Sequence, residues 1–518
     1  FGDWYVDAFA QSVGKLTPLV PSDAYQARIE RYVLESLIVR DPETLAWRPW
    51  IARDWQVSED GLTYTFDLRE DVVFADGEPL TSEDVVFTYE MITDPAVNAP
   101  QLQSYYAKVR EARADGPYRV IFEMSEPYFM SLSISGGMRI MPKHFYEKFS
   151  PEEFNTLPGL LFGSGPYRLD TDPETWQPDD QQIVLVRNQR YWGPRPVFDR
   201  LVWKTIPDPT AEQVSFINGE VDRFGVPPDQ YDRLKDKPAL NKQGELYRFD
   251  TVASSYSYIG WNQFRDGEPT VFADKRVRQA MTMLIHRQEM IEQILSGLAS
   301  VVTGPFPPAS QQSNPDVEPW PYDPERAKKL LAEAGITDTD SDGVLEKPDG
   351  DDFVVTLTYP SQNPTYRQLA LFYKDALAVG GVTLEPRPLE WNTMLQKLDE
   401  RDFDAITLAW SGGVQSDPKQ IFHSDSIEGG GNNFVSYRNE ELDRLIDEAR
   451  VTIDPKEREQ RWHRVHAILR EDQPYTFLFT REAVLFLDDR FRNVEVTKLG
   501  LNDRLEYYVP TPDQRWSE

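Results

Sequence analysis

The stretch FVVTLTYPSQNPTYRQLALFYKDALAVGGVTLEPRPLEWNTMLQKLDERDFDAITLAW, residues 353–410, decides the fold class of this chain. Three of its segments are apolar runs of the kind that form buried strands: 353–359, 382–389 and 403–410. Between them, residues 365–379 and 391–398 repeat apolar side chains at helical spacing. Strands that alternate with helices over short connections predict a parallel sheet covered by helices, and hence an α/β fold.

Such a sheet also predicts where a ligand binds, because ligands lie beyond the carboxyl ends of parallel strands. Three loops meet this rule: residues 359–363, 389–391 and 410–417. Trp410 and Trp391 end or follow neighbouring strands, so two indoles are expected to face one cleft; a core position for both is the alternative. Ser411, Gly412 and Gly413 add hydrogen-bonding groups and let a ligand approach the backbone closely.

The composition sets the broad class of protein. A chain of 518 residues is too long for one hydrophobic core, so at least two lobes are expected. Asp and Glu total 86 against 55 for Lys and Arg, and the net charge of −31 argues against nucleic acid as a partner and favours a monomer. The absence of cysteine excludes disulfides and thiolate chemistry. No apolar run approaches the ~18 residues that a membrane span needs.

Other segments give local predictions. Residues 62–68 alternate apolar and polar side chains as a half-buried strand does, and residues 274–298 predict one long amphipathic helix. Asp-Pro pairs at 323–324 and 454–455 predict helix starts. Residues 303–325 contain seven prolines but also large aromatic residues, so they are expected to be ordered and packed.

An acidic loop is the candidate metal site. Three aspartates stand at alternate positions: Asp338, Asp340 and Asp342. Gly343 permits a sharp turn, Val344 can offer a carbonyl, and the twelfth position is Asp349 where a calcium loop usually has Glu. Oxygen donors at this spacing suit Ca²⁺. The loop is therefore predicted to hold a structural Ca²⁺, with a solvated acidic turn as the alternative, and no catalytic cofactor is expected.

The sequence gives little support for a catalytic motif. His463 and His466 are three residues apart without the HExxH pattern, and residues 163–165 do not form a GxSxG elbow. The many carboxylates would permit a glycosidase pair, but nothing in the sequence pairs two of them. A ligand-binding protein is expected; a secreted carbohydrate-active enzyme and a surface adhesion or chaperone-like protein are the alternatives from other classes.

Seven motifs, taken in order, resemble the bacterial extracellular solute-binding protein family 5, the peptide- and nickel-binding group. They are PWIARDWQVSEDGLTYTFDLREDVVFADGEPLTSED (49–84), GSGPY (163–167), NQRYWG (188–193), INGEVD (217–222), YIGWN (258–262), DKRVRQA (274–280) and YDPERAKKLLAEAG (322–335). Any one motif is weak evidence for the family, whereas the order and spacing of all seven are specific to it. The resemblance covers about residues 17 to 482, which is nearly the whole chain.

The resemblance implies a two-lobed periplasmic-binding-protein (Venus-flytrap, type II) fold with an extra α+β domain in the first lobe. The expected divisions are residues 1–40, 167–257 and 483–518 for lobe I, 41–166 for the extra domain, and 258–482 for the α/β lobe II. It further implies capture of a peptide-like ligand in a cleft between the lobes and delivery to the permease of an ABC importer. No catalysis is implied. The protein is expected in the periplasm or at the extracellular face of the membrane, either free or lipid-anchored.

Residue by residue, the resemblance also implies that Thr17, in the N-terminal pocket segment 16–18, contributes from lobe I. At two places the sequence departs from the pattern. Peptide binders of this family usually carry Asp where this chain has Gly413, and dipeptide binders tend to place Arg near residues 359–364, where this chain has none at the matching place. Asp417 is the candidate substitute for the amine partner. An ammonium desolvated without a partner costs several kcal/mol. A longer peptide, or an oligosaccharide stacking on Trp391 and Trp410, is therefore expected in place of a dipeptide.

Overall fold

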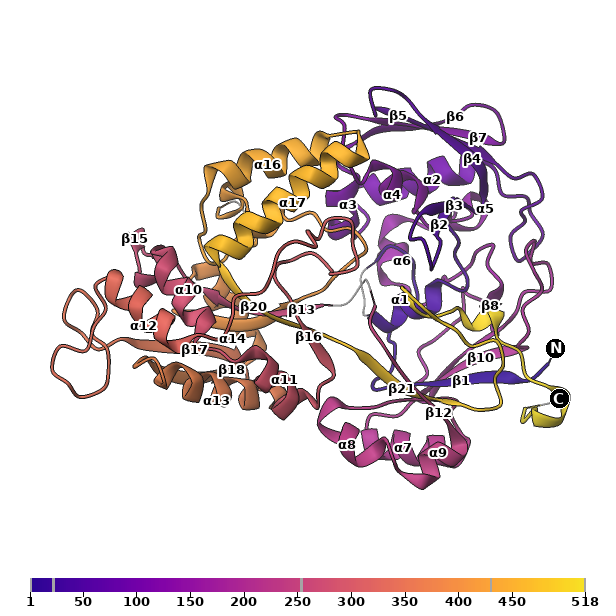
Figure 1. Ribbon diagram of the computed structural model, residues 1–518. Helices are drawn as coiled ribbons and strands as arrows, with labels where there is room; N and C mark the ends of the chain where they lie inside the picture. Colours follow the sequence, from indigo (N-terminus) through magenta and orange to yellow (C-terminus); the bar gives the residue numbers. More distant parts are fainter. Residues whose placement is uncertain (1, 21–23, 252–254, 429–430, 517–518) are drawn as a thin grey trace. The chain divides into compact units, whose positions relative to one another are not determined.

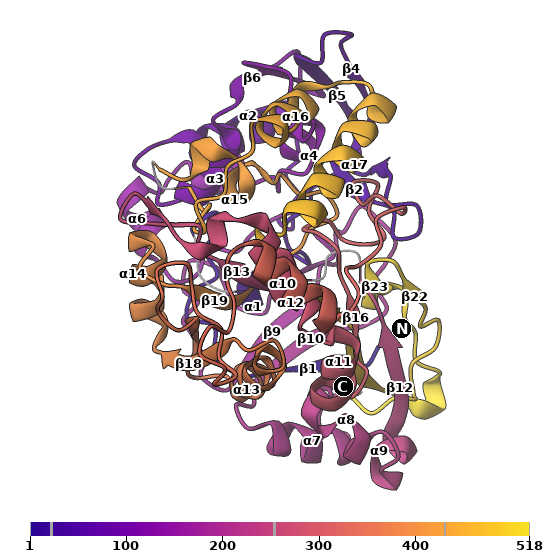
Figure 2. The same cartoon turned by 60° about the vertical axis from the view of Figure 1, so that its left-hand side comes forward.

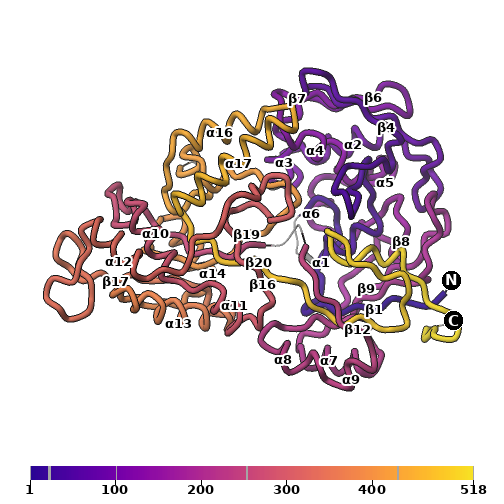
Figure 3. The backbone as a smooth tube through the Cα atoms, viewed as in Figure 1, coloured from indigo at the N-terminus to yellow at the C-terminus, as the bar shows by residue number. Residues whose placement is uncertain are grey.

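The computed structural model describes residues 2–20, 24–251, 255–428 and 431–516 (Figure 1). The chain divides into two compact units. Unit 1 comprises Phe1–Val226, Arg233–Arg248 and Val484–Glu518, and unit 2 comprises Pro227–Asp232 and Phe249–Ala483. Helices and strands mix in both, and Figure 3 traces the backbone through them. The predicted α/β fold with more than one hydrophobic core is confirmed.

Among the residues that the structure describes, unit 1 has three sheets of three or more strands. The first has the order β1 (Trp4–Phe9), β10 (Arg200–Thr205), β9 (Gln182–Arg187), β8 (Tyr167–Leu169), with β1 parallel to β10 and the other pairs antiparallel. The second has the order β11 (Arg223–Gly225), β21 (Ala483–Asp488), β12 (Gly244–Phe249). Both sheets join segments that are far apart in the sequence, so the C-terminal part of the chain completes this unit.

A third sheet of unit 1 is antiparallel and has its own core. Its order is β4 (Ala52–Val57), β5 (Thr63–Leu68), β7 (Arg119–Met124), β6 (Val109–Ala114). Along β5 buried side chains alternate with partly exposed ones, which confirms the strand predicted at residues 62–68. Val85 of α2 (Ser82–Thr93) and Ile134 of α4 (Ser131–Gly136) belong to the same apolar cluster. At the start of α2 the Thr81 N–H donates to the Asp84 carboxylate at 2.8 Å.

The other elements of unit 1 are short. They are α1 (Ala24–Glu30), β2 (Ile38–Arg40), β3 (Trp47–Pro49), α3 (Pro100–Tyr106), α5 (Lys143–Tyr146), α6 (Pro151–Thr156), α7 (Pro209–Ile217), α9 (Pro238–Gln243), β22 (Val496–Thr497) and β23 (Gly500–Leu501). Strand β2 pairs antiparallel with β3, and β22 with β23.

Unit 2 holds the sheet that residues 353–410 predict. Its order is β16 (Ala299–Val301), β20 (Tyr475–Arg481), β13 (Tyr256–Trp261), β19 (Ala405–Trp410), β17 (Val354–Pro360), β18 (Thr383–Leu389). Strand β17 runs parallel to both β18 and β19, as expected, and β13 runs antiparallel to β19 and β20. Helix α13 (Pro364–Ala378) connects β17 to β18, and α14 (Trp391–Glu400) connects β18 to β19.

The prediction of one long helix over residues 274–298 is wrong in one respect. The structure has two helices there, α10 (Lys275–Met283) and α11 (Arg287–Leu295). His286 caps the second one, since its Nδ1 accepts the Glu289 N–H at 3.1 Å. Leu284 and Ile285 remain buried at the break, so the apolar stripe continues while the helical hydrogen bonding does not. Both helices pack into one core on one face of the sheet.

The predicted helix starts and the packed proline-rich segment are confirmed. Asp323 caps α12 (Pro324–Glu333) and Asp454 caps α17 (Pro455–Asp472). Within residues 303–325, Phe306 packs edge-on against Trp462, and the Trp320 indole donates to the Arg470 carbonyl at 2.7 Å. In Figures 1 and 2, α17 lies beside α16 (Glu440–Val451), its neighbour in the sequence.

Candidate ligand-binding site

The carboxyl edge of the sheet in unit 2 brings the predicted loops together. Strand pairing places Trp410, Tyr256 and Thr480 in one row across β19, β13 and β20. Since β19 and β20 both run antiparallel to β13, they end at the same edge. The ends of β17 and β18 pair directly there, at Pro360 and Leu389. The loops at 359–363, 389–391 and 410–417 therefore leave the sheet on one side, as predicted.

Trp410 lies in a series of near-parallel rings on the sheet face opposite to the helical core. Tyr475 and Tyr258 are 4.0 Å apart between centroids, Tyr258 and Trp410 6.3 Å, and Trp410 and Phe434 6.2 Å, with interplanar angles of 15°, 6° and 6°. The two tyrosines are fully buried, whereas Trp410 and Phe434 are partly exposed. Trp410 is thus the point at which an aromatic core reaches the candidate site, a position that serves both packing and ligand contact.

Trp391 lies in a different environment from Trp410. It is the first residue of α14, and 43% of its surface is exposed. Glu390 caps this helix, accepting the Asn392 N–H at 2.9 Å. Among the aromatic pairs of the described residues, Trp391 makes no ring contact with Trp410. The structure therefore places both indoles at the carboxyl edge but does not join them in one wall.

Part of the loop that follows Trp410 is already engaged within the protein. The Ser416 N–H donates to Gln312 Oε1 at 2.7 Å, and Gln312 Nε2 donates back to the Ser416 carbonyl at 2.8 Å. Arg450 Nε donates to the Asp417 carboxylate at 2.8 Å. A ligand amine at Asp417 would have to compete with this guanidinium. Of the predicted residues, Ser411 is exposed and Gly412 and Gly413 are partly exposed, so they form the open part of the loop.

Thr17 belongs to unit 1 and is completely buried. Its hydroxyl donates to the carbonyls of Leu157 and Gly159, and its own carbonyl accepts from Gln26 Nε2 at 2.9 Å. These bonds fasten the N-terminal segment to residues that lie about 140 positions further along the chain. The Thr17 side chain is therefore used for internal packing.

Two residues at the edge of unit 2 were missed by the sequence analysis. The Tyr256 hydroxyl is buried and, within the described part of the chain, has no hydrogen-bond partner. It borders a small pocket together with Val302, residues 305–308 and Thr480. Arg481 is the last residue of β20 and stands next to Thr480. The only sequence signal for Arg481 is a charge at the end of the apolar run YTFLFT, residues 475–480.

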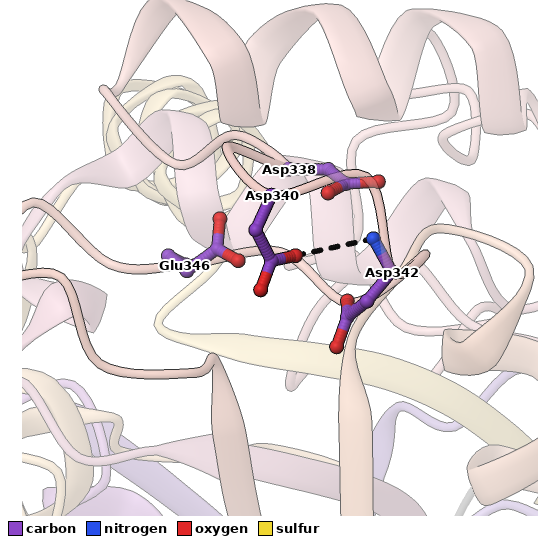
Figure 4. A group of neighbouring side chains, drawn as sticks. All are labelled: Asp338, Asp340, Asp342 and Glu346. Atoms are coloured by element: carbon purple, nitrogen blue, oxygen red, sulfur yellow. Dashed lines mark hydrogen bonds between the residues drawn. The ribbon is translucent and has the colours of Figure 1, made fainter.

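The acidic loop gathers four carboxylates (Figure 4). Asp338, Asp340, Asp342 and Glu346 each offer an oxygen atom, and these atoms all lie within 4.8 Å of one another. Glu346, of which 7% is exposed, accepts the Thr339 N–H at 2.7 Å. The predicted ligand Asp349 lies outside this group, 3.6 Å from the Lys347 ammonium. Val344 donates its N–H to Asp342 at 2.8 Å. The fourth carboxylate of the group is therefore at the ninth loop position instead of the twelfth.

In unit 1 three of the motifs of the sequence analysis converge on one buried carboxylate. Glu35 accepts hydrogen bonds from Trp50 Nε1 at 2.8 Å, Ser164 Oγ at 2.8 Å, the Tyr191 hydroxyl at 3.0 Å and Trp192 Nε1 at 2.8 Å. Burial raises the pKa of Glu35, and the four donors oppose that rise. The motifs PW, GSGPY and NQRYWG thus hold the fold of this unit together.

Comparisons with known proteins agree with this architecture. Residues 46–433 match the family described as bacterial extracellular solute-binding proteins, family 5 Middle. The oligopeptide-binding protein AppA of Bacillus subtilis (strain 168) is 31% identical over 487 residues, which cover 91% of this chain and 86% of AppA. The structure of the Bacillus subtilis protein in complex with a nonapeptide is 28% identical with a TM-score of 0.77, over 98% of this chain and 99% of that one. NikA of Brucella suis, in complex with Fe(III)-EDTA, shares the fold at 21% identity, a TM-score of 0.83, and coverage of 98% and 100%.

The fold and the open carboxyl edge define an α/β protein of the two-lobed, solute-binding class. More specifically, the chain belongs to the bacterial extracellular solute-binding proteins, family 5. Its family and its relatives are binding proteins. Across the described residues, every helix is too short or too polar to cross a membrane.

Proposed function

We propose that this protein captures a peptide at the carboxyl edge of the sheet in unit 2 and delivers it to the permease of an ABC importer. The observation that carries the proposal is the convergence of three loops at this edge, with Trp410 and the open segment 411–413 among them. The names of the relatives, oligopeptide-binding among them, support a peptide as the ligand.

The site favours a peptide longer than two residues. Gly413 has no side chain to bind a terminal ammonium, and Asp417 is held by Arg450. Ligand affinity therefore depends on backbone hydrogen bonds from residues 411–413 and on apolar contact with Trp410, both of which grow with ligand length. Trp391, being exposed, offers a further stacking surface at the same edge.

The same proposal includes the setting of the protein. It acts outside the cytoplasmic membrane, free or lipid-anchored, and the net charge of −31 keeps it monomeric by self-repulsion. The acidic loop holds a structural Ca²⁺, for which Asp338, Asp340, Asp342 and Glu346 supply oxygen donors of the type that this ion prefers.

A thermal-shift screen tests the ligand class. The protein is heated with pooled dipeptides, tripeptides, nonapeptides, oligosaccharides and nickel chelates. A ligand at about 100 times its dissociation constant adds roughly 2.7 kcal/mol to the native state, which gives a visible shift. A shift with nonapeptides supports the proposal. A shift with sugars alone contradicts it and indicates a carbohydrate-binding member of the family, and hydrolysis of any glycan during the screen would indicate an enzyme.

The variant Gly413→Asp tests the reason given for ligand length. A Cβ atom at this position meets the Gln415 carbonyl at 3.2 Å, which is tight but leaves room for a small side chain. The new carboxylate should add binding of short peptides with a free amino group, and no gain is expected for the same peptides after N-acetylation. Unchanged binding of short peptides would show that a missing amine partner does not set the length preference.

A further inference from the structure

Arg481 stands at the edge of unit 2 where the three loops meet. It ends β20, one residue beyond Thr480, which lies in the same row as Tyr256 and Trp410. Its strand partner on the other side is Ala299 of β16. Because side chains alternate along a strand, Arg481 shares its sheet face with Phe479, a member of the helical core. Its guanidinium therefore lies at the carboxyl edge of the sheet, on the face that the helical core covers.

Arg481 has no carboxylate within ion-pair distance in the part of the chain that the structure describes, although its side chain is partly buried. Its charged group is 5.8 Å from the Phe479 ring centre, and Tyr366 and Tyr373 of α13 are the other groups that act on its charge. Burial lowers the pKa of Arg481, and Tyr366 and Tyr373 oppose this change. A cation removed from water without a partner is unfavourable, so an external anion gains by binding there.

We propose that Arg481 binds a carboxylate of the peptide ligand. This inference rests on the peptide-binding function proposed above and adds a residue and a ligand group to it. A guanidinium presents a planar pair of donors that matches a carboxylate and forms two parallel hydrogen bonds with it. The ligand carboxylate comes either from the C-terminus of the peptide or from an acidic side chain.

Three nonapeptide pools separate these sources. The first pool lacks Asp and Glu and has free C-termini, the second is the same pool with C-terminal amides, and the third is amidated with one Glu in each peptide. Dissociation constants are measured by titration calorimetry for the wild type, Arg481→Gln and the control Arg367→Gln. Arg367 is an exposed arginine on α13, one residue after Tyr366. It carries the same charge near the same edge without being buried.

The wild type should bind the first or the third pool at least about tenfold more tightly than the second. Arg481→Gln should bind all three equally, and Arg367→Gln should behave like the wild type. A preference for the first pool identifies the terminus, and a preference for the third pool identifies a side chain. Equal wild-type binding of all pools, or a preference that survives in Arg481→Gln, overturns the role of Arg481 while peptide binding stands. Absence of binding to every pool overturns the proposed function itself.

Stability measurements complete the test. Arg481→Gln should unfold at the wild-type temperature or above it, because it removes an unpaired, partly desolvated cation. Should this variant fail to fold, Arg481→Lys replaces it in the same assay. Lysine keeps the charge but loses the planar pair of donors, so the preference between pools should shrink. An undiminished preference in Arg481→Lys would contradict the two-bond geometry and with it the proposal.

Discussion

Two arginines, one in each unit, illustrate how differently the same side chain is used. Arg490 of unit 1 is 3% exposed and contacts three carboxylates, those of Asp3, Asp222 and Asp488, while it also donates to the Trp4 carbonyl. Arg481 of unit 2 is partly buried and has no carboxylate within ion-pair distance among the described residues. Both guanidinium groups are at least partly removed from water, and the number of carboxylate partners within the protein separates them.

The difference indicates two purposes. The partners of Arg490 come from the start, the middle and the end of unit 1, so this guanidinium joins segments that are distant in the sequence. A charge that is fully paired within the protein stabilises one arrangement of these segments and is not free to bind a ligand. A buried charge without partners inside the protein costs stability unless a ligand binds it. Residues in this state are common at binding sites.

The largest effect is expected for Arg490→Met. Removal of this guanidinium leaves the buried Asp3 and Asp222 without their nearest cation, whereas Asp488 keeps its pair with Arg515, so the free energy of unfolding should fall by about 3–5 kcal/mol. Denaturant unfolding followed by tryptophan fluorescence measures the change. Arg492→Gln is the matched control, because Arg492 is exposed and its pair with Asp513 at 3.5 Å is a surface pair, worth less than about 1 kcal/mol. Equal losses in the two variants would contradict the comparison.

His466 provides a third case, a buried ionisable group that is satisfied while neutral. Its Nδ1 accepts the Asn314 N–H at 2.9 Å, and its Nε2 lies 2.9 Å from the Thr303 hydroxyl. Burial lowers the pKa of His466 from 6.5 to about 4. The unfolded chain therefore binds a proton between these two values while the native protein does not, and the stability of the native protein falls as the pH drops from 6.5 to 4.

The variant His466→Gln should lose this pH dependence. Between pH 6.5 and 4 the wild type should lose about 3 kcal/mol more than the variant does, which unfolding curves at several pH values will measure. His463→Gln is the control on the same helix: His463 is partly exposed and is only the second cause of the lowered pKa of His466, after burial, so this variant should keep most of the pH dependence. Parallel pH profiles of the wild type and His466→Gln would show that another group is responsible.

The fold could be predicted from the sequence to the extent that local patterns report burial. The strands and helices of residues 353–410 follow from apolar periodicity, and Asp323 and Asp454 mark helix starts because their caps are local. The break at His286 could not be predicted in this way. An apolar stripe reports which face is buried, and Leu284 and Ile285 are buried whether or not the helix is continuous.

The candidate site could be predicted only in outline. The loops at the carboxyl edge follow from the direction of the strands, but the internal partners that occupy Asp417 and Ser416 lie 33 and 104 residues away along the chain. No spacing rule connects positions so far apart. The isolation of Arg481 is still harder to foresee, because it depends on which side chains are absent from its surroundings in three dimensions.

A smaller effect is expected for Trp410→Ala. Loss of the stacked ring should weaken binding of nonapeptides by about 1–3 kcal/mol, because Trp410 is partly exposed at the carboxyl edge and is held in place by its stacking on Tyr258 and Phe434. Trp391→Ala is the matched variant at the same edge, and its effect should be smaller because this ring is not held by neighbouring rings. Unchanged affinity of Trp410→Ala together with a lower unfolding temperature would assign Trp410 to the core alone.

The smallest effect concerns the acidic loop. Its four carboxylates form no ion pair with a cation of the described residues, whereas the aspartates around Arg490 share a guanidinium. Ca²⁺ at ten times its dissociation constant should add about 1.4 kcal/mol to the native state, and EDTA should remove this gain. Elemental analysis and thermal unfolding measure binding and stability separately. Glu346→Gln should abolish the Ca²⁺-dependent shift, whereas Asp349→Asn should keep it, since Asp349 lies outside the group of four carboxylates. The opposite result would favour the twelfth loop position as the ligand, and the absence of both metal and shift would make the loop a solvated acidic turn.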